Sequence, residues 1–259
     1  MKKSYSFQRI PRSRIATFDT FSIGLQKHHV SALLEFDVTD IRRKLQSERR
    51  SGREISLNAW LIKTISKVVS EHKEAAAFRY SKKKLILFDD INVSLLIEKQ
   101  LGAKKVPIPL LIEMTNKKSA IEINSEIEKA KMQALTEEDI VLQKNTARYE
   151  NIYYHLPGFI RRLTWRIMLG NPRFIFRKMG NVVVTSVGMM GRINGWFIHK
   201  SIHPLSFGIG SIIKKPVVIN NEVRVREILN MTILCDHDVI DGAPMVKLLN
   251  DLTKYIEKG

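Results

Sequence analysis

The feature that most constrains this chain is a short motif between an expected strand and an expected helix near the C-terminus. Residues 229–235 mix threonine with apolar residues, as strands do. Between the strand and the helix lies CDHDVIDGAP, residues 235–244, in which Asp241 and Gly242 follow a histidine. Pro244 suits the first turn of the helix, whose expected buried stripe is Met245, Leu248, Leu249, Leu252 and Ile256.

His237, the histidine of this motif, is the residue best suited to acid–base chemistry. Histidine has an ordinary pKa of about 6.5, so its neutral ring accepts a proton near pH 7. A thiol, with a pKa of about 8.5, is a suitable proton donor to such a base. Asp241 would hold the loop by hydrogen bonds or an ion pair, and Gly242 would permit a tight turn before the helix.

Periodicity predicts the remaining elements. We expect strands at 30–38, 84–89, 91–97, 181–187 and 206–213, and a hairpin over 215–225 turning at Asn220-Asn221. We expect helices from Ile41 to about Arg50, at 57–71 after an N-cap at Ser56, at 117–135, and as two short pieces within 152–179. Pro107 and Pro109 place their stretch at a sheet edge or in a loop.

The charge of the chain favours an anionic partner. Its 43 Lys and Arg against 26 Asp and Glu give a formal net charge of +17, with runs at 82–84 and 161–162. Nucleic acid, an anionic membrane surface and a phosphorylated ligand would all suit this field, and so would a solvated surface without a partner. One cysteine permits no internal disulfide, and the first residues lack the apolar stretch of a secretory signal, so we expect a cytoplasmic protein. No run of about 18 apolar residues predicts a membrane span.

Other candidate sites are weaker. His28, His29, His199 and His203 suggest a metal, but the pair at 199 and 203 is followed by Pro204 in a loop-like context, so we expect none. Cys235 lies among apolar residues at a strand end and is expected to be inert. Aromatic and arginine residues interleave in 152–179, which favours two helices packed on the domain over membrane or nucleic-acid binding.

Several stretches carry a family resemblance. LCDHDVIDGAPMVKLLNDL, residues 234–252, resembles the C-terminal signature of the dihydrolipoamide acyltransferase catalytic domain of 2-oxo acid dehydrogenase complexes. Chloramphenicol acetyltransferase shares that fold and its His-x3-Asp-Gly motif. The stretches at 28–43, 57–72 and 182–191 look like further parts of the same domain. The resemblance covers roughly residues 25–135 and 181–257.

The resemblance implies an α/β (α+β two-layer) fold of chloramphenicol acetyltransferase type, with a mixed central sheet covered by helices. The catalytic domain would span 28–259 behind an N-terminal arm of 1–27. It would work as a homotrimer, or a larger assembly of trimers, with sites between subunits. The residue matching the family base is His237, and the one matching its oxyanion donor is Thr185, or Ser186 if the register slips by one. Coenzyme A would take part as an acyl-CoA substrate, without a metal.

The chain also departs from the family pattern. It leaves no room for lipoyl domains, Asp238 stands where the family has an arginine, and residues 137–179 do not match the usual short connection. We therefore expect a stand-alone acyltransferase whose acceptor is unidentified, with a lipoyl domain on a separate chain as one option. The alternative is a catalytically inactive trimeric scaffold or binding protein of the same fold. Nucleic-acid binding is not expected, because only the charge supports it.

Overall fold

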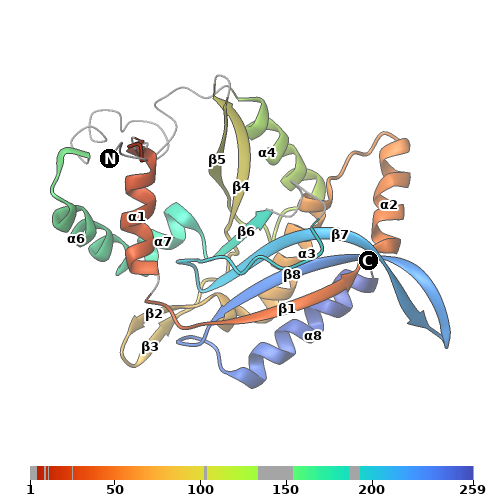
Figure 1. The fold of residues 1–259 in the computed structure, drawn as a ribbon. Helices are drawn as coiled ribbons and strands as arrows, with labels where there is room; N and C mark the ends of the chain where they lie inside the picture. The colour runs from red at the N-terminus through yellow and green to blue at the C-terminus, as the bar shows by residue number, and fades with distance from the viewer. Residues whose placement is uncertain are drawn as a thin grey trace.

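A six-stranded mixed sheet organises the protein in this computed structural model (Figure 1). The structure describes residues 5–8, 10, 12–24, 26–101, 104–133, 154–186 and 193–258. The sheet order is β1-β8-β7-β6-β4-β5, with parallel pairing of β6 to both β4 and β7. The strands are β1 His29–Asp37, β4 Val93–Leu101, β5 Lys104–Ile112, β6 Val182–Ser186, β7 Leu205–Ile219 and β8 Glu222–Asp236. A separate hairpin joins β2 Phe78–Ser81 to β3 Lys84–Ile86.

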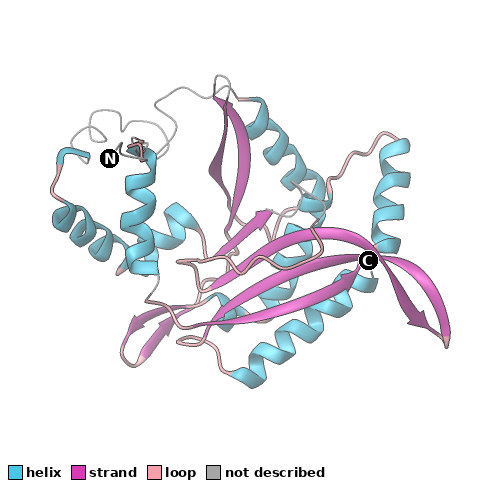
Figure 2. Ribbon diagram, in the orientation of Figure 1, coloured by secondary structure: helices cyan, strands magenta, loops and turns pink. Residues whose placement is uncertain are grey.

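The main helices cover one face of this sheet (Figure 2). They are α2 Thr39–Arg50, α3 Leu57–Glu71, α4 Ala120–Met132 and α8 Gly242–Lys258, with a short 3₁₀ helix at Lys73–Ala76. The core forms where α3 and α8 meet the sheet, and it includes the in-register neighbours Val184, Phe207 and Ile233. The predicted mixed sheet with covering helices is therefore confirmed.

The alternation of strand side chains puts a second set of residues on the opposite face. Thr185, Gly208 and Thr232 are also in-register neighbours, one position along from the core set. The segment 193–204 crosses this face: Trp196 Nε1 donates to the carbonyl of Leu34 at 3.1 Å. Polar side chains on this face are thus enclosed between the sheet and a crossing segment.

Local sequence signals account for several element ends. Ser56 Oγ accepts the backbone N–H of Ala59 at 3.3 Å, as an N-cap does. Asn220 and Asn221 both have positive φ, 51° and 64°, which is the conformation of a two-residue turn between twisted strands. The Pro107 stretch forms β5, a full strand at the sheet edge, where a missing backbone donor is tolerated.

The N-terminal region differs from the expected arm. A helix, α1 Arg12–Gly24, lies beside α6 Gly158–Leu169 (Figure 1). Arg161 Nε donates to Asp19 Oδ2 at 2.7 Å, and both side chains are largely buried. This long-range ion pair supplies a reason for the helix that local sequence did not show. The two helices expected within 152–179 are α6 and α7 Pro172–Met179, whereas residues 137–153 lie outside the described part.

None of the helices in the described ranges is long and apolar enough to span a bilayer.

Candidate active site

The loop that carries His237 is held by the residue before it. Asp236, at the end of β8, is 1% exposed and forms an ion pair with Lys27. Its Oδ1 accepts the backbone N–H of Asp238 at 3.2 Å, and its carbonyl accepts the N–H groups of Val239 and Ile240 at 3.0 and 3.2 Å. One buried aspartate therefore closes the turn that leads into α8.

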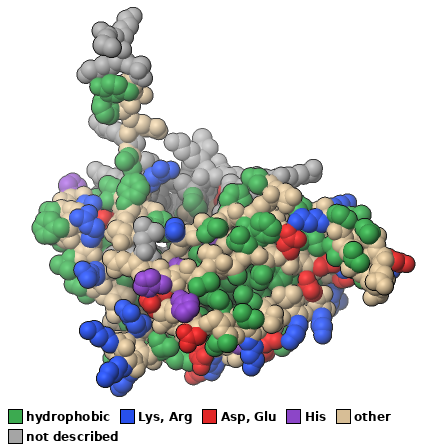
Figure 3. Space-filling model, turned by 60° about the horizontal axis from the view of Figure 1, so that its bottom comes forward, with side chains coloured by type: hydrophobic (Ala, Val, Ile, Leu, Met, Phe, Trp, Pro, Cys, Tyr) green, Lys and Arg blue, Asp and Glu red, His purple; other side chains and the backbone are tan. Residues whose placement is uncertain are grey.

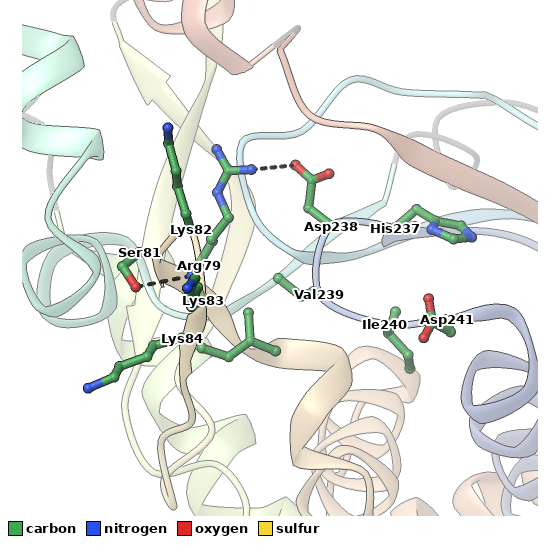
Figure 4. Close-up of a pocket in the computed structure, with 11 residues that line it drawn as sticks. Arg79, Ser81, Lys82, Lys83, Lys84, His237, Asp238, Val239, Ile240 and Asp241 are labelled. Carbon is green, nitrogen blue, oxygen red and sulfur yellow. Dashed lines mark hydrogen bonds and ion pairs between the residues drawn. The ribbon is translucent and has the colours of Figure 1, made fainter.

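Two further contacts fix the loop against neighbouring elements. The backbone N–H of His237 donates to the carbonyl of His28 at 2.9 Å. Asp238 accepts from His28 Nδ1 at 3.0 Å and faces Arg79 Nη1 of β2 at 3.8 Å (Figure 4). The side chain of His237 itself is exposed and points away from the β2–β3 hairpin. Asp238, which replaces the expected family arginine, thus connects the loop to β2 through Arg79.

A cavity of about 360 Å³ lies between this loop and the β2–β3 hairpin. One wall is formed by residues 237–241 and the other by the hairpin. We call the Arg and Lys side chains on the hairpin side the basic wall: Arg79, Lys82, Lys83 and Lys84. All four are exposed, and Lys and Arg side chains gather at this end of the molecule in Figure 3. The space next to His237 is therefore bordered by positive charge.

Asp241 and Gly242 take simpler positions than expected. The carbonyl of Asp241 accepts the N–H of Met245 at 3.0 Å, which begins α8. Its carboxylate is exposed, and no described residue forms a hydrogen bond or ion pair with it. Gly242 does not have a positive φ, and a Cβ there would meet nothing within 4 Å. Within one chain, the turn therefore does not require a glycine at position 242, contrary to expectation.

Thr185 and Ser186 point to opposite faces of β6. Thr185 is 7% exposed and lines a small second cavity of about 10 Å³ on the face that segment 193–204 crosses. Ser186 shares the core face with Val184, and its hydroxyl has no partner among described residues. Of the two hydroxyls predicted as oxyanion donors, only that of Thr185 lies at a cavity that the structure defines.

One chain does not bring Thr185 and His237 together. Thr185 is level with Thr232 across the sheet, and His237 lies five residues further along β8 and two strands away. At about 3.3 Å per residue and about 4.8 Å per strand, the two positions are roughly 20 Å apart. The cavities beside them share no lining residue. A site that uses both side chains needs a second copy of the chain.

The other histidines and Cys235 have structural surroundings. Burial lowers the pKa of His203 to about 4, and its Nε2–H donates to the carbonyl of Met179 at 2.9 Å. His29 donates in turn to the carbonyl of His203 at 2.9 Å. Over the described ranges, no three His, Cys, Asp or Glu gather where they could hold a metal. Burial raises the pKa of Cys235 to about 12, which suits an inert thiol.

Comparisons with known proteins agree with this architecture. Residues 178–259 match the family model of the 2-oxoacid dehydrogenases acyltransferase (catalytic domain). The dihydrolipoyllysine-residue acetyltransferase component of the pyruvate dehydrogenase complex of Rickettsia conorii is 22% identical over 225 residues, which are 85% of this chain and 44% of that protein. The chain is thus similar to the 2-oxoacid dehydrogenase acyltransferase catalytic domains. The match to these curated relatives includes most of this chain but less than half of their own length.

Solved structures of acyltransferases have the same fold as this chain. A dihydrolipoamide acetyltransferase from Azotobacter vinelandii, studied for the roles of a serine, a histidine and an asparagine in its mechanism, superposes with a TM-score of 0.69 at 15% identity, covering 98% of this chain and 93% of that one. A chloramphenicol acetyltransferase superposes with a TM-score of 0.51 at 12% identity, covering 99% and 100%. The chloramphenicol acetyltransferase-like fold that the family resemblance implied is confirmed.

Sequence reasoning missed the residues that hold the site. Lys27 precedes β1, far from the motif in sequence, and no local pattern marks it as a partner of Asp236. The basic run at 82–84 was visible, but its position across from His237 depends on the fold. The only signal for Asp236 was its place at a strand end directly before the histidine.

Asp236 should therefore matter more for stability than its exposed neighbour. Asp236→Asn keeps the size of the side chain but leaves Lys27 without its counter-charge at a buried strand end. Because Lys27 still reaches solvent, we expect a loss of about 2 kcal/mol in the free energy of unfolding, below the cost of breaking a fully buried pair. Asp238→Asn is the matched control and should cost less than about 1 kcal/mol. Urea unfolding of both variants measures the difference, and equal losses would contradict this account of the loop.

Proposed function

We propose that this protein is a coenzyme A-dependent acyltransferase in which His237 is the general base. The observation that carries the proposal is the position of His237: the fixed loop that bears it forms one wall of a cavity whose opposite wall is basic. A base next to a positively charged recess suits a thiol substrate that carries phosphates. Membership among acyltransferase relatives supports the same reaction class.

The reaction would run in two steps, addition and collapse, and neither step would need a metal. The imidazole of His237 takes the thiol proton, and the thiolate sulfur attacks the carbonyl carbon of the acyl thioester. The carbonyl electron pair moves to oxygen, and the Thr185 hydroxyl donates a hydrogen bond to the resulting oxyanion. Collapse of the tetrahedral intermediate re-forms the carbonyl and breaks the bond to the sulfur of the original thioester. This leaving thiolate then receives the proton from the imidazolium of His237.

The residues investigated in the Azotobacter relative support these roles. In that protein the histidine and the asparagine stand four positions apart. His237 and Asp241 have the same spacing, with aspartate in place of asparagine. The serine there and Thr185 here are both hydroxyl residues. Asp241 would act across a subunit boundary, because its carboxylate has no partner within the described part of its own chain.

The separation of Thr185 and His237 supports a shared site. We propose that the protein works as a homotrimer in which His237 of one copy faces Thr185 of the next. The family forms trimeric cores, and a cyclic assembly repeats one heterologous contact at each boundary. Such an assembly would complete a site that a single chain holds in two halves.

The basic wall would hold the phosphates of coenzyme A. Its three consecutive lysines are exposed at the tip of the β2–β3 hairpin. Coenzyme A joins its thiol to its phosphates through a long flexible arm, so the phosphates and His237 need not touch. The acyl acceptor is a second substrate; a lipoyl domain on another chain is one option, and an assay with thiol, amine and hydroxyl acceptors would identify its class.

Removing the base should abolish most of the activity. His237→Ala should lower the rate of acyl transfer from acetyl-CoA by about a hundredfold or more, because no other group takes the thiol proton. His72→Gln, which alters a histidine bonded to Asp251 away from both cavities, is the control. Coenzyme A release and thermal midpoint would be measured for both. Undiminished turnover in His237→Ala would refute the mechanism, and binding without any turnover in the wild type would favour the inactive scaffold.

Neutralising the basic wall should weaken coenzyme A binding and its dependence on salt. Replacing Lys82, Lys83 and Lys84 together by Gln should raise the Kd about tenfold at low salt and less at high salt, where screening already reduces the attraction. The control replaces three exposed lysines outside the cavity, Lys44, Lys129 and Lys258. Calorimetry at two salt concentrations measures the effect, and equal changes in the two triple variants would show that only net charge matters.

A further inference from the structure

The small cavity beside Thr185 is surrounded by buried polar atoms without partners. Thr232 is 1% exposed and Asn230 is 0% exposed. Thr232 Oγ1, Asn230 Oδ1 and His199 Nδ1 are buried, and none of them forms a hydrogen bond of good geometry with a described residue; the carbonyl of Phe197 lies near the ring of His199 without meeting that geometry. All three residues line the same cavity as Thr185. Buried polar atoms are nearly always paired, so three unpaired ones around one space indicate a site for a polar ligand.

The fold fixes the ring of His199 with Nδ1 at this cavity. The Nε2 atom is bonded to the hydroxyl of Ser206. The ring lies so close to β7 that a Cβ on Gly208 would be 2.8 Å from Nδ1, which explains the glycine at that position. A side chain held by a hydrogen bond on one nitrogen and by close contact of its Nδ1 and Cε1 atoms with Gly208 has little freedom to turn. The position of the second ring nitrogen, Nδ1, at the cavity is therefore fixed by the fold.

The ring of His199 is neutral, and its Nδ1 is a donor in the tautomer in which Nε2 accepts from Ser206. Burial lowers the pKa of His199, helped by nearby His29 and opposed by the carbonyl of Phe197, so the ring is neutral at pH 7. When the hydroxyl of Ser206 donates to Nε2, the ring hydrogen is on Nδ1 and points to the cavity. Together with the hydroxyls of Thr185 and Thr232, the cavity then presents three neutral donors.

We propose that this cavity is a binding site for a single oxygen atom, with His199 and Thr232 as further catalytic residues beside Thr185. Its volume of about 10 Å³ is enough for about one water molecule, which would also donate to Asn230 Oδ1 in the resting protein. During the reaction the carbonyl oxygen of the acyl thioester replaces that water. This second statement rests on the proposed acyl transfer.

The chemical role is charge stabilisation without proton transfer. When the sulfur attacks, the carbonyl electron pair moves to oxygen, and hydrogen bonds from His199, Thr185 and Thr232 would share the negative charge. His199 stays neutral throughout, since the proton of the reaction is carried by His237. The donors are fixed before the reaction, which is the condition under which such bonds lower a barrier most.

Two substitutions of His199 separate this role from packing. The amide nitrogen of Asn lies near the position of Nδ1, whereas that of Gln lies near the position of Nε2 and its Ser206 partner. His199→Asn should therefore keep kcat within about threefold of the wild type, and His199→Gln should lower kcat about tenfold or more with little change in KM. Similar losses in both variants, or full activity in both, would overturn the role of Nδ1.

Thr232→Val tests the same site without a change of shape. Its hydroxyl is buried and has no hydrogen-bond partner among the described residues, so its removal should leave the thermal midpoint unchanged or raise it, while kcat falls about tenfold. Thr64→Val is the matched control, because the hydroxyl of Thr64 is bonded to the carbonyl of Trp60. That variant should lose stability and keep kcat. A Thr232→Val protein with full kcat would remove Thr232 from the site.

A readout independent of activity distinguishes failure of this site from failure of the proposed function. In a crystal structure of the substrate-free protein at high resolution, we expect density for one oxygen atom within hydrogen-bonding distance of both His199 Nδ1 and Thr232 Oγ1. If that density is present and the protein transfers no acyl group, the oxygen site stands and the proposed function fails. If acyl transfer proceeds and that density is absent while His199→Gln keeps kcat, the oxygen site fails and the proposed function stands.

Discussion

The buried ion pair between Asp236 and Lys27 is the interaction on which the arrangement of this site depends. It holds the side chain of Asp236, whose carboxylate and carbonyl accept the hydrogen bonds that close the turn after β8, and the backbone of that turn then determines where His237 lies. A carboxylate this deeply buried would be costly without a counter-charge, and Lys27, next to the start of β1, supplies one. The pairing of β1 with β8 brings these two residues together, because His29 is in register with Asp236. Sheet register and site geometry are thus linked.

The same sheet separates two kinds of polar chemistry. At its end, the loop with His237 faces a basic hairpin across an open cavity. On the face opposite the core, Thr185 lines a small enclosed pocket under segment 193–204. The open cavity suits a general base and an anionic substrate, and the enclosed pocket suits an oxygen atom that accepts hydrogen bonds. Joining them requires contact between copies, and we propose that the assembly, rather than the chain alone, forms the working site.

The parts of this picture that were predictable are those encoded locally. Ser56 marks a helix start, Asn220-Asn221 marks a hairpin, and the strand–loop–helix setting of His237 is visible in the spacing of residues 229–256. The parts that were not predictable rest on contacts between distant residues. Lys27 and Asp236 are paired across most of the sequence, and α1 is held by Asp19 and Arg161 rather than by a clear apolar stripe. His199 gave only a weak metal signal, because its environment exists only once the fold brings Gly208 next to its ring.

Complementation between two inactive variants tests the shared site most directly. His237→Ala lacks the base but keeps Thr185, and Thr185→Val lacks the hydroxyl but keeps the base. When the two variants are co-expressed in equal amounts and assemble at random, an intact His237 faces an intact Thr185 at about a quarter of the subunit boundaries. The account predicts that the mixed protein regains about a quarter of wild-type acyl transfer, well above either variant alone. Recovery no greater than the average of the two variants, in assemblies shown to contain both chains, would contradict a site built from two copies.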